Sequence, residues 1–161
     1  MGQYHYVVNL DKKEFLHPHK LGCGLKAKEQ IGSLPGTPAA LFALLVCSND
    51  RGGGDLDEDC AVVGRWAGDR IAVVGDYAEK RDLPKRKGCD RADRIYDMCV
   101  KGAYQDVSGL LTDFLEKEFG VVYDGGDGGW GSWSKNSEEE PCTDARHAKT
   151  AIGSGDRSTS R

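Results

Sequence analysis

The segment 52–77, GGGDLDEDCAVVGRWAGDRIAVVGDY, constrains the possible fold more than any other part of this chain. Its first part joins three consecutive glycines to an acidic run. Its second part places two runs rich in β-branched residues, 61–66 and 70–74, on either side of Ala67-Gly68-Asp69. Because β-branched residues favour strands and Gly and Asp favour tight turns, this second part predicts a β-hairpin with Trp66 in its first strand.

A second hairpin is predicted at the N-terminus. The run QYHYVVNL at 3–10 is rich in aromatic and β-branched residues, and an extended pattern resumes at 14–16 after Asp11 and Lys12. Together the two hairpins predict a small antiparallel sheet.

Three helices are expected to cover this sheet. Thr37 and Pro38 suit the start of a helix that runs to about residue 46, and this helix is apolar nearly all round, so we expect it to be buried. Asp90 is predicted to cap the second helix, and Gly120 to end the third. The last two helices predict a C-terminal helical hairpin, and the fold class is α+β, with a small antiparallel sheet of hairpins packed against the buried helix and that helical hairpin.

The length and composition predict one domain followed by a tail. A chain of 161 residues fits a single core. Residues 124–131 are mostly Gly and Asp, and residues 132–161 contain almost no aliphatic side chains. Such a segment buries too little apolar surface to offset its ordering entropy. We therefore expect a domain at 1–123 and a flexible tail at 124–161.

Cysteine usage, hydropathy and charge limit the function classes. The six cysteines are scattered without a CxxC pair, and the N-terminus does not have the pattern of a signal peptide, so we expect reduced thiols and a cytoplasmic protein. The longest apolar run, 39–47, is far shorter than the roughly 20 residues of a membrane span. The formal net charge of −4 does not favour a nucleic-acid binder.

The segment His17-Pro18-His19 is the first candidate site. Pro18 favours an extended conformation at His17, and residues two apart in an extended chain project to the same side. With Asp55, the two imidazoles could therefore hold Zn²⁺ or another divalent metal. The alternative is that both histidines shape the loop, and no cofactor is the expected state.

A small-molecule site is the second candidate. The backbone at Gly53 can approach a ligand closely, and Arg51, Asp55, Arg65 and Arg70 lie near it in sequence. The segment lacks the Gly-Lys-Ser/Thr ending of a phosphate loop, so exposed loop charge is the competing interpretation.

Two further features indicate contact with a partner. Residues 79–101 carry eight Lys or Arg against five acids, and the run Lys85, Arg86 and Lys87 suits an acidic or phosphate-bearing partner. Trp130 and Trp133 stand in an otherwise polar region, where large aromatic side chains either pack on the domain or dock on a partner.

The strings MGQYHYVVNLDKKEFLHPHKLG, RGGGDL and GRWAGDRIAVVGDYAE resemble those of a family of small uncharacterised proteins found in bacteria and their phages. The resemblance extends over about residues 1–110. It implies a bacterial or mobile-element setting and no particular activity.

Three functions from different classes remain. The favoured one is a non-enzymatic cytoplasmic binding or interaction protein, a phage or mobile-element accessory factor that modulates a host protein. The first alternative is a nucleotide or small-molecule binding module. The second is a metal-dependent hydrolase that uses His17, His19 and Asp55 to hold a metal with a reactive water.

Overall fold

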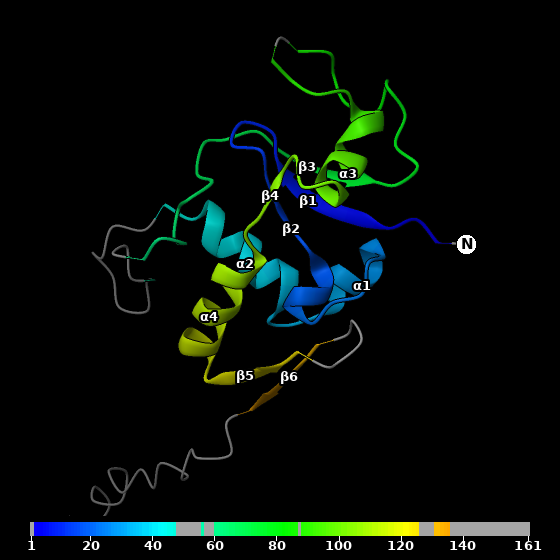
Figure 1. Cartoon of the computed structure of the whole chain (residues 1–161). Coiled ribbons are helices and arrows are strands. Elements are labelled where there is room, and N and C mark those ends of the chain that lie inside the picture. The colour runs from blue at the N-terminus through cyan, green and yellow to red at the C-terminus, as the bar shows by residue number, and fades with distance from the viewer. Residues whose placement is uncertain (1, 48–55, 57–59, 87, 126–130, 136–161) are drawn as a thin grey trace, which may run out of the picture.

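The computed structural model describes residues 2–47, 56, 60–86, 88–125 and 131–135. At its centre lies a four-stranded sheet of order β3-β1-β2-β4 (Figure 1). Its strands are β1 (His5–Asn9), β2 (Glu14–Leu16), β3 (Ile71–Gly75) and β4 (Gln105–Asp106). The predicted N-terminal hairpin is confirmed, because β1 pairs with β2 in antiparallel register. The prediction of an antiparallel sheet is wrong in one respect: β4 runs parallel to β2, which makes the sheet mixed.

Both faces of the sheet are covered, and alternate side chains of β1 and β2 divide between them. Val7 and Leu16 contribute to one hydrophobic cluster. Tyr6, Val8 and Phe15 contribute to the other. This division follows from the two-residue period of a strand, and because both sets are apolar, helices or loops must cover both faces.

The covering helices do not form the predicted C-terminal helical hairpin. Helix α3 (Ala92–Val100) packs Ile95 and Cys99 into the cluster that holds Tyr6, whereas α4 (Ser108–Phe119) packs Leu111 and Leu115 into the cluster that holds Val7. The two helices therefore cover opposite faces of the sheet, and the connection through β4 carries the chain between them.

The start of α3 also differs from the prediction. Arg91, not Asp90, is the N-cap residue, and it makes no side-chain capping hydrogen bond. The carboxylate of Asp90 instead accepts a hydrogen bond from the Tyr104 hydroxyl at 3.0 Å. The predicted stop of α4 is confirmed, since Gly120 adopts a left-handed conformation with φ of 57°.

The predicted hairpin over 61–74 is wrong. Strand β3 pairs with β1, while the residues before it form turns in which Gly64 and Gly68 have φ of 68° and 80°. These left-handed conformations break an extended chain. The backbone N–H of Trp66 donates to the Leu44 carbonyl at 2.8 Å, and the indole is fully buried. Trp66 is thus a core residue held by a turn, not by a strand.

Helix α2 (Gly36–Leu45) lies beside the short helix α1 (Ala27–Gly32) and packs on the same face of the sheet as α4. Pro35 is its N-cap residue, so the prediction that Thr37 caps the helix is wrong. Full burial is also wrong, because Leu44 is 0% exposed but Phe42 is 68% exposed. The helix presents an apolar side to the core and another to its surroundings.

The predicted tail begins too early. Strand β5 (Val121–Asp124) pairs in antiparallel register with β6 (Ser132–Lys135). The indole N–H of Trp133 donates to the Leu21 carbonyl at 3.0 Å, at the end of the 3₁₀ helix η1 (Pro18–Leu21). A polar strand is held here because one aromatic side chain anchors it to the domain. Residues 136–161 lie outside the described part.

Candidate functional site

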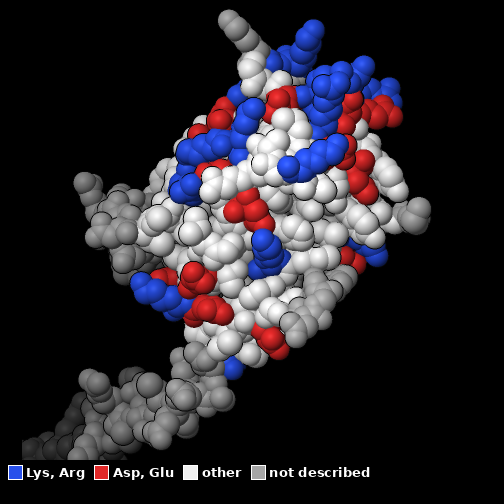
Figure 2. All heavy atoms as spheres, in the orientation of Figure 1, with Lys and Arg blue, Asp and Glu red and all other residues white. Residues whose placement is uncertain are grey.

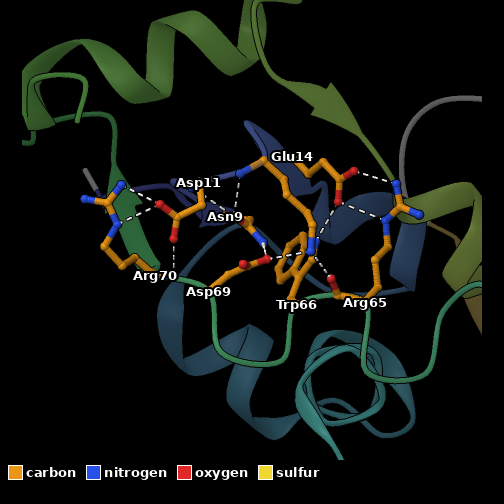
Figure 3. Close-up of polar contacts among 8 residues, drawn as sticks. Asn9, Asp11, Glu14, Arg65, Trp66, Asp69 and Arg70 are labelled. Atoms are coloured by element: carbon orange, nitrogen blue, oxygen red, sulfur yellow. Dashed lines mark hydrogen bonds and ion pairs between the residues drawn. The ribbon is translucent and has the colours of Figure 1, made fainter. Parts of the chain in front are cut away.

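Arg65, one of the predicted ligand-binding residues, forms a partly buried ion pair with Glu14 (Figure 3). Its Nε and Nη2 atoms donate to the two carboxylate oxygens of Glu14 at 3.0 and 2.5 Å, and the indole of Trp66 donates to the same carboxylate at 2.7 Å. Burial acts to raise the pKa of Glu14, but the hydrogen bonds from Arg65 and Trp66 outweigh it and hold the pKa below its usual value. The guanidinium of Arg65 is therefore engaged in the fold.

Arg70 is engaged in the same way by the turn between β1 and β2. Its backbone N–H and its guanidinium both donate to the carboxylate of Asp11, with the Nε contact at 2.8 Å. Its Nη1 atom also donates to the Cys89 sulfur at 2.6 Å. The arginine lowers the pKa of Asp11 by these hydrogen bonds. Arg51, Gly53 and Asp55 lie outside the described residues, so the structure does not place them with Arg65 or Arg70.

The two histidines of the first candidate site do lie close together. The ring centroids of His17 and His19 are 5.6 Å apart, and the ring of Tyr6 lies 5.3 Å from that of His17. The backbone N–H of His17 donates to the Ser108 hydroxyl at 2.7 Å, which ties this segment to the start of α4. Burial lowers the pKa of His17, so its imidazole is held in the neutral form.

No group of three His, Cys, Asp or Glu side chains in the described part of the chain is arranged to hold a metal ion. The predicted third ligand, Asp55, lies outside that part. The metal site with His17 and His19 therefore stays a prediction. This segment helps to hold the fold together, because Pro18 and Leu21 are buried and η1 packs against α4.

The second region with functional character is a cationic surface beside α3, which we define by Lys80, Lys85, Arg86 and Arg91. Figure 2 shows Lys and Arg side chains gathered on the end of the molecule that carries α3 and the loop before it in Figure 1. All four line an open pocket of about 270 Å³, and Arg86 also lines an adjoining pocket of about 250 Å³. Both pockets share an apolar wall of Leu83 and Pro84.

Some cations of this surface form ion pairs and others do not. The guanidinium of Arg91 pairs with Asp93 at 2.5 Å, and nearby Arg81 pairs with Glu79 at 2.9 Å. Lys85 and Arg86 have no ion pair with any residue that the structure describes. Both side chains are exposed, and Lys87, the third member of the predicted run, lies outside the described residues. The surface therefore offers cationic groups to an anion.

A third region is an apolar groove between α2 and the C-terminal end of α4. Its volume is about 850 Å³, and it is lined by Leu34, Phe42 and Phe119 among others. These three side chains are 80%, 68% and 54% exposed, an unusual degree for large apolar residues. Sequence reasoning missed this groove, although its signal was present: a helix that is apolar all round cannot bury every side in so small a domain.

The predicted partner residues divide between these regions. Lys85 and Arg86 lie on the cationic surface, and their contact with a partner stays a prediction. Trp133 instead packs partly buried against the domain, with the ring of Tyr123 5.1 Å away. Trp130 lies outside the described residues.

Comparison of the chain with protein-family models, with curated proteins and with solved structures gave no match. Among the helices of the described residues, none has the length and hydropathy needed to cross a bilayer.

Proposed function

We propose that this chain is a non-enzymatic binding protein whose cationic surface holds an acidic segment of a partner protein. The observation that carries this proposal is the pair Lys85 and Arg86, which are exposed on a concave surface without a carboxylate partner among the described residues. The resemblance to bacterial and phage proteins makes a host protein the expected partner and an accessory factor the expected role.

The chemistry of the surface suits carboxylates set among apolar side chains. An arginine fork can bind a carboxylate through two parallel hydrogen bonds, and Lys85 supplies a second charge beside it. Leu83 and Pro84 offer apolar contact between the charged groups. Asp90 lines the larger pocket, and Asp93 pairs with Arg91 beside it; such interspersed acids disfavour the continuous phosphate backbone of a nucleic acid.

The test compares charge reversal at two places in the full chain. The double variant Lys85→Glu, Arg86→Glu is matched by Lys28→Glu, Lys117→Glu, which changes the net charge equally at exposed positions on α1 and α4. The probe is a labelled peptide of alternating Glu and Leu, with binding followed by fluorescence anisotropy. We expect the first variant to lose roughly tenfold or more in affinity and the control to change less than about twofold.

Equal binding by the wild type and the Lys85, Arg86 variant would contradict the proposal, as would binding that does not weaken between low and physiological salt. Repeating the measurement with a chain that ends at Lys135 shows whether residues 136–161 contribute. That endpoint keeps β6, whereas an end at Tyr123 would remove the Trp133 anchor.

A phosphate-bearing small molecule is the second candidate for the same surface. The pocket of about 270 Å³ is close to the lower limit of ordinary ligand sites, which run from about 300 Å³ upwards. A thermal-shift series with inorganic phosphate, pyrophosphate and nucleoside triphosphates distinguishes the two. Stabilisation by a nucleotide that Arg86→Glu abolishes favours the small molecule, and its absence together with peptide binding favours the protein partner.

A further inference from the structure

Strand β3 forms one edge of the four-stranded sheet. The outer backbone groups of Ile71 and Val73 have no partner in the described part of the chain, whereas the Gly75 carbonyl accepts a hydrogen bond from the Ala78 N–H at 3.1 Å. β3 pairs only with β1, and two flanking hydrogen bonds fix which residues face that neighbour. Leu10 N–H donates to the Arg70 carbonyl at 2.9 Å, and Asp76 N–H donates to the Tyr4 carbonyl at 3.0 Å. In an antiparallel ladder this places Ala72 and Val74 in the hydrogen-bonded pairs with β1.

The intervening residues therefore direct their backbone groups away from β1. None of the described residues donates to or accepts from the backbone of Ile71 or Val73 on that outer side. The side chain of Val73 is 58% exposed. This edge thus presents unpaired donors and acceptors together with an exposed β-branched side chain.

The edge lacks the features that usually protect one. The sequence of β3 is IAVVG, which contains neither proline nor any charged residue. Edge strands of monomeric proteins are generally guarded by such residues, because unpaired backbone groups act as a template for another strand. An unguarded edge of this length favours strand addition.

We propose that β3 pairs with β3 of a second copy of this chain, in antiparallel register about a two-fold axis at Val73. The two four-stranded sheets then form one continuous sheet across a homodimer. In this register the outward N–H of each Val73 donates to the carbonyl of the other copy's Val73, and Ile71 lies opposite Gly75. The pairing is isologous, so it closes at two copies and leaves no further edge at β3.

The sequence around β3 is complementary to itself in this orientation. The segment 70–76 reads RIAVVGD, with a basic residue at one end, an acidic residue at the other and apolar residues between. Antiparallel pairing about Val73 places Asp76 of one copy opposite Arg70 of the other. The Asp76 carboxylate accepts a hydrogen bond from the Tyr4 N–H but has no ion pair among the described residues, so in the dimer Arg70 would face Asp76 in addition to Asp11 of its own chain. Opposite charges in directly facing positions stabilise a strand pair, whereas the shifted registers lose this match. This charge complementarity is the reason for a second copy as the occupant, in preference to an unrelated peptide.

The test uses the full chain and measures both whether two copies associate and which residues form the contact. Sedimentation velocity over a range of protein concentrations reports the monomer–dimer equilibrium. Hydrogen exchange, followed at low and high concentration, reports which amides become protected. We expect a dimer whose formation slows exchange at Ile71 and Val73, because these amides are exposed to water in a single copy and bonded in the pair.

Two variants of Val73 interrupt the pairing in different ways. Val73→Pro removes only an outward N–H that has no partner in a single copy, a position where edge strands accept proline. Val73→Lys brings two ammonium groups together at the two-fold axis. Each should weaken the dimer by about tenfold or more. Val100→Lys, at a position 63% exposed on α3, makes the same chemical change elsewhere and should leave the equilibrium unaltered.

Thermal unfolding at low concentration verifies that the variants keep the fold. A chain that remains monomeric at every concentration overturns the proposal. So does a dimer that forms without concentration-dependent protection at Ile71 and Val73, or one that persists in both Val73 variants.

Discussion

At the scale of single residues, Glu14 connects the hairpin to the turn that buries Trp66. Its side chain is 6% exposed and receives hydrogen bonds from Arg65 and Trp66, which come from a segment about fifty residues later in the chain. A buried carboxylate is tolerated because its charge is paired and its oxygens accept hydrogen bonds. The sequence marks none of this, since Glu14 occupies an ordinary strand position.

We expect Glu14→Gln to lower the free energy of unfolding by about 1–3 kcal/mol, because the amide keeps the shape but leaves the Arg65 guanidinium without its counter-charge. Urea unfolding followed by Trp fluorescence measures this. Asp11→Asn is the control, since the Asp11 carboxylate is 34% exposed, against 6% for Glu14, and its ion pair with Arg70 should matter less. A larger loss for Asp11→Asn than for Glu14→Gln would contradict this ranking.

The buried imidazole of His17 predicts a dependence of stability on pH. Its pKa is lowered in the folded chain by burial, while the unfolded chain keeps the ordinary value of about 6.5. Below that value the unfolded state binds the extra proton first, so stability falls as the pH drops from about 6.5 toward the folded pKa. His17→Phe, measured by urea unfolding at a series of pH values, should flatten this part of the profile. An unchanged slope would show that other groups produce it.

At the scale of elements, α2 has two apolar sides with different roles. Leu44 is fully buried in the cluster that includes Trp66, while Phe42, two residues earlier, lines the groove and is 68% exposed. Exposed apolar surface of this kind is typical of contact sites, and nothing in the described residues covers it.

Aspartate substitutions at these two positions should therefore have opposite outcomes. Leu44→Asp places an unpaired charge in the core, at a cost of several kcal/mol, comparable with the whole stability of a small domain, and should abolish cooperative unfolding. Phe42→Asp should change the free energy of unfolding by less than about 1 kcal/mol. Thermal unfolding by circular dichroism compares them. Similar losses for both would mean that Phe42 is covered in solution.

At the scale of the whole molecule, the sheet separates the regions of interest. The cationic surface lies with α3 on one face, the apolar groove lies with α2 and α4 on the other, and the free edge of β3 runs between them. Ile71 and Ala72 of β3 line the smaller pocket beside Arg86, so the cationic surface and the β3 edge adjoin, but the charge reversals and the Val73 variants change different side chains. The proposed binding and the proposed dimer can therefore fail independently.

The fold class and several elements could be predicted because local pattern decides them. The β1–β2 hairpin follows from alternation at 3–16, and α3 and α4 follow from apolar residues at helical spacing that end near Gly102 and Gly120. The cationic loop follows from its charges alone. In each case the interactions that decide the structure join residues that are close together in the sequence.

Apart from the two misplaced helix caps, the main errors concern choices between distant segments. The run 61–66 has β propensity, yet burial of Trp66 against α2 and Glu14 outweighs it. The strip 132–135 is polar, yet the anchor at Trp133 orders it. The arginines at 65 and 70 suggested a ligand, yet Glu14 and Asp11 occupy them.

By itself, the sequence determined that this chain forms an α+β domain with two amphipathic helices near its C-terminal end and a cationic loop before them. Only the tertiary structure decided that β3 joins β1 at an open edge, that α3 and α4 lie on opposite faces, and which cations remain without a counter-charge. The physical reason is that propensity and periodicity act over neighbouring residues, whereas strand pairing, burial and ion pairing are settled by competition among segments of the whole chain.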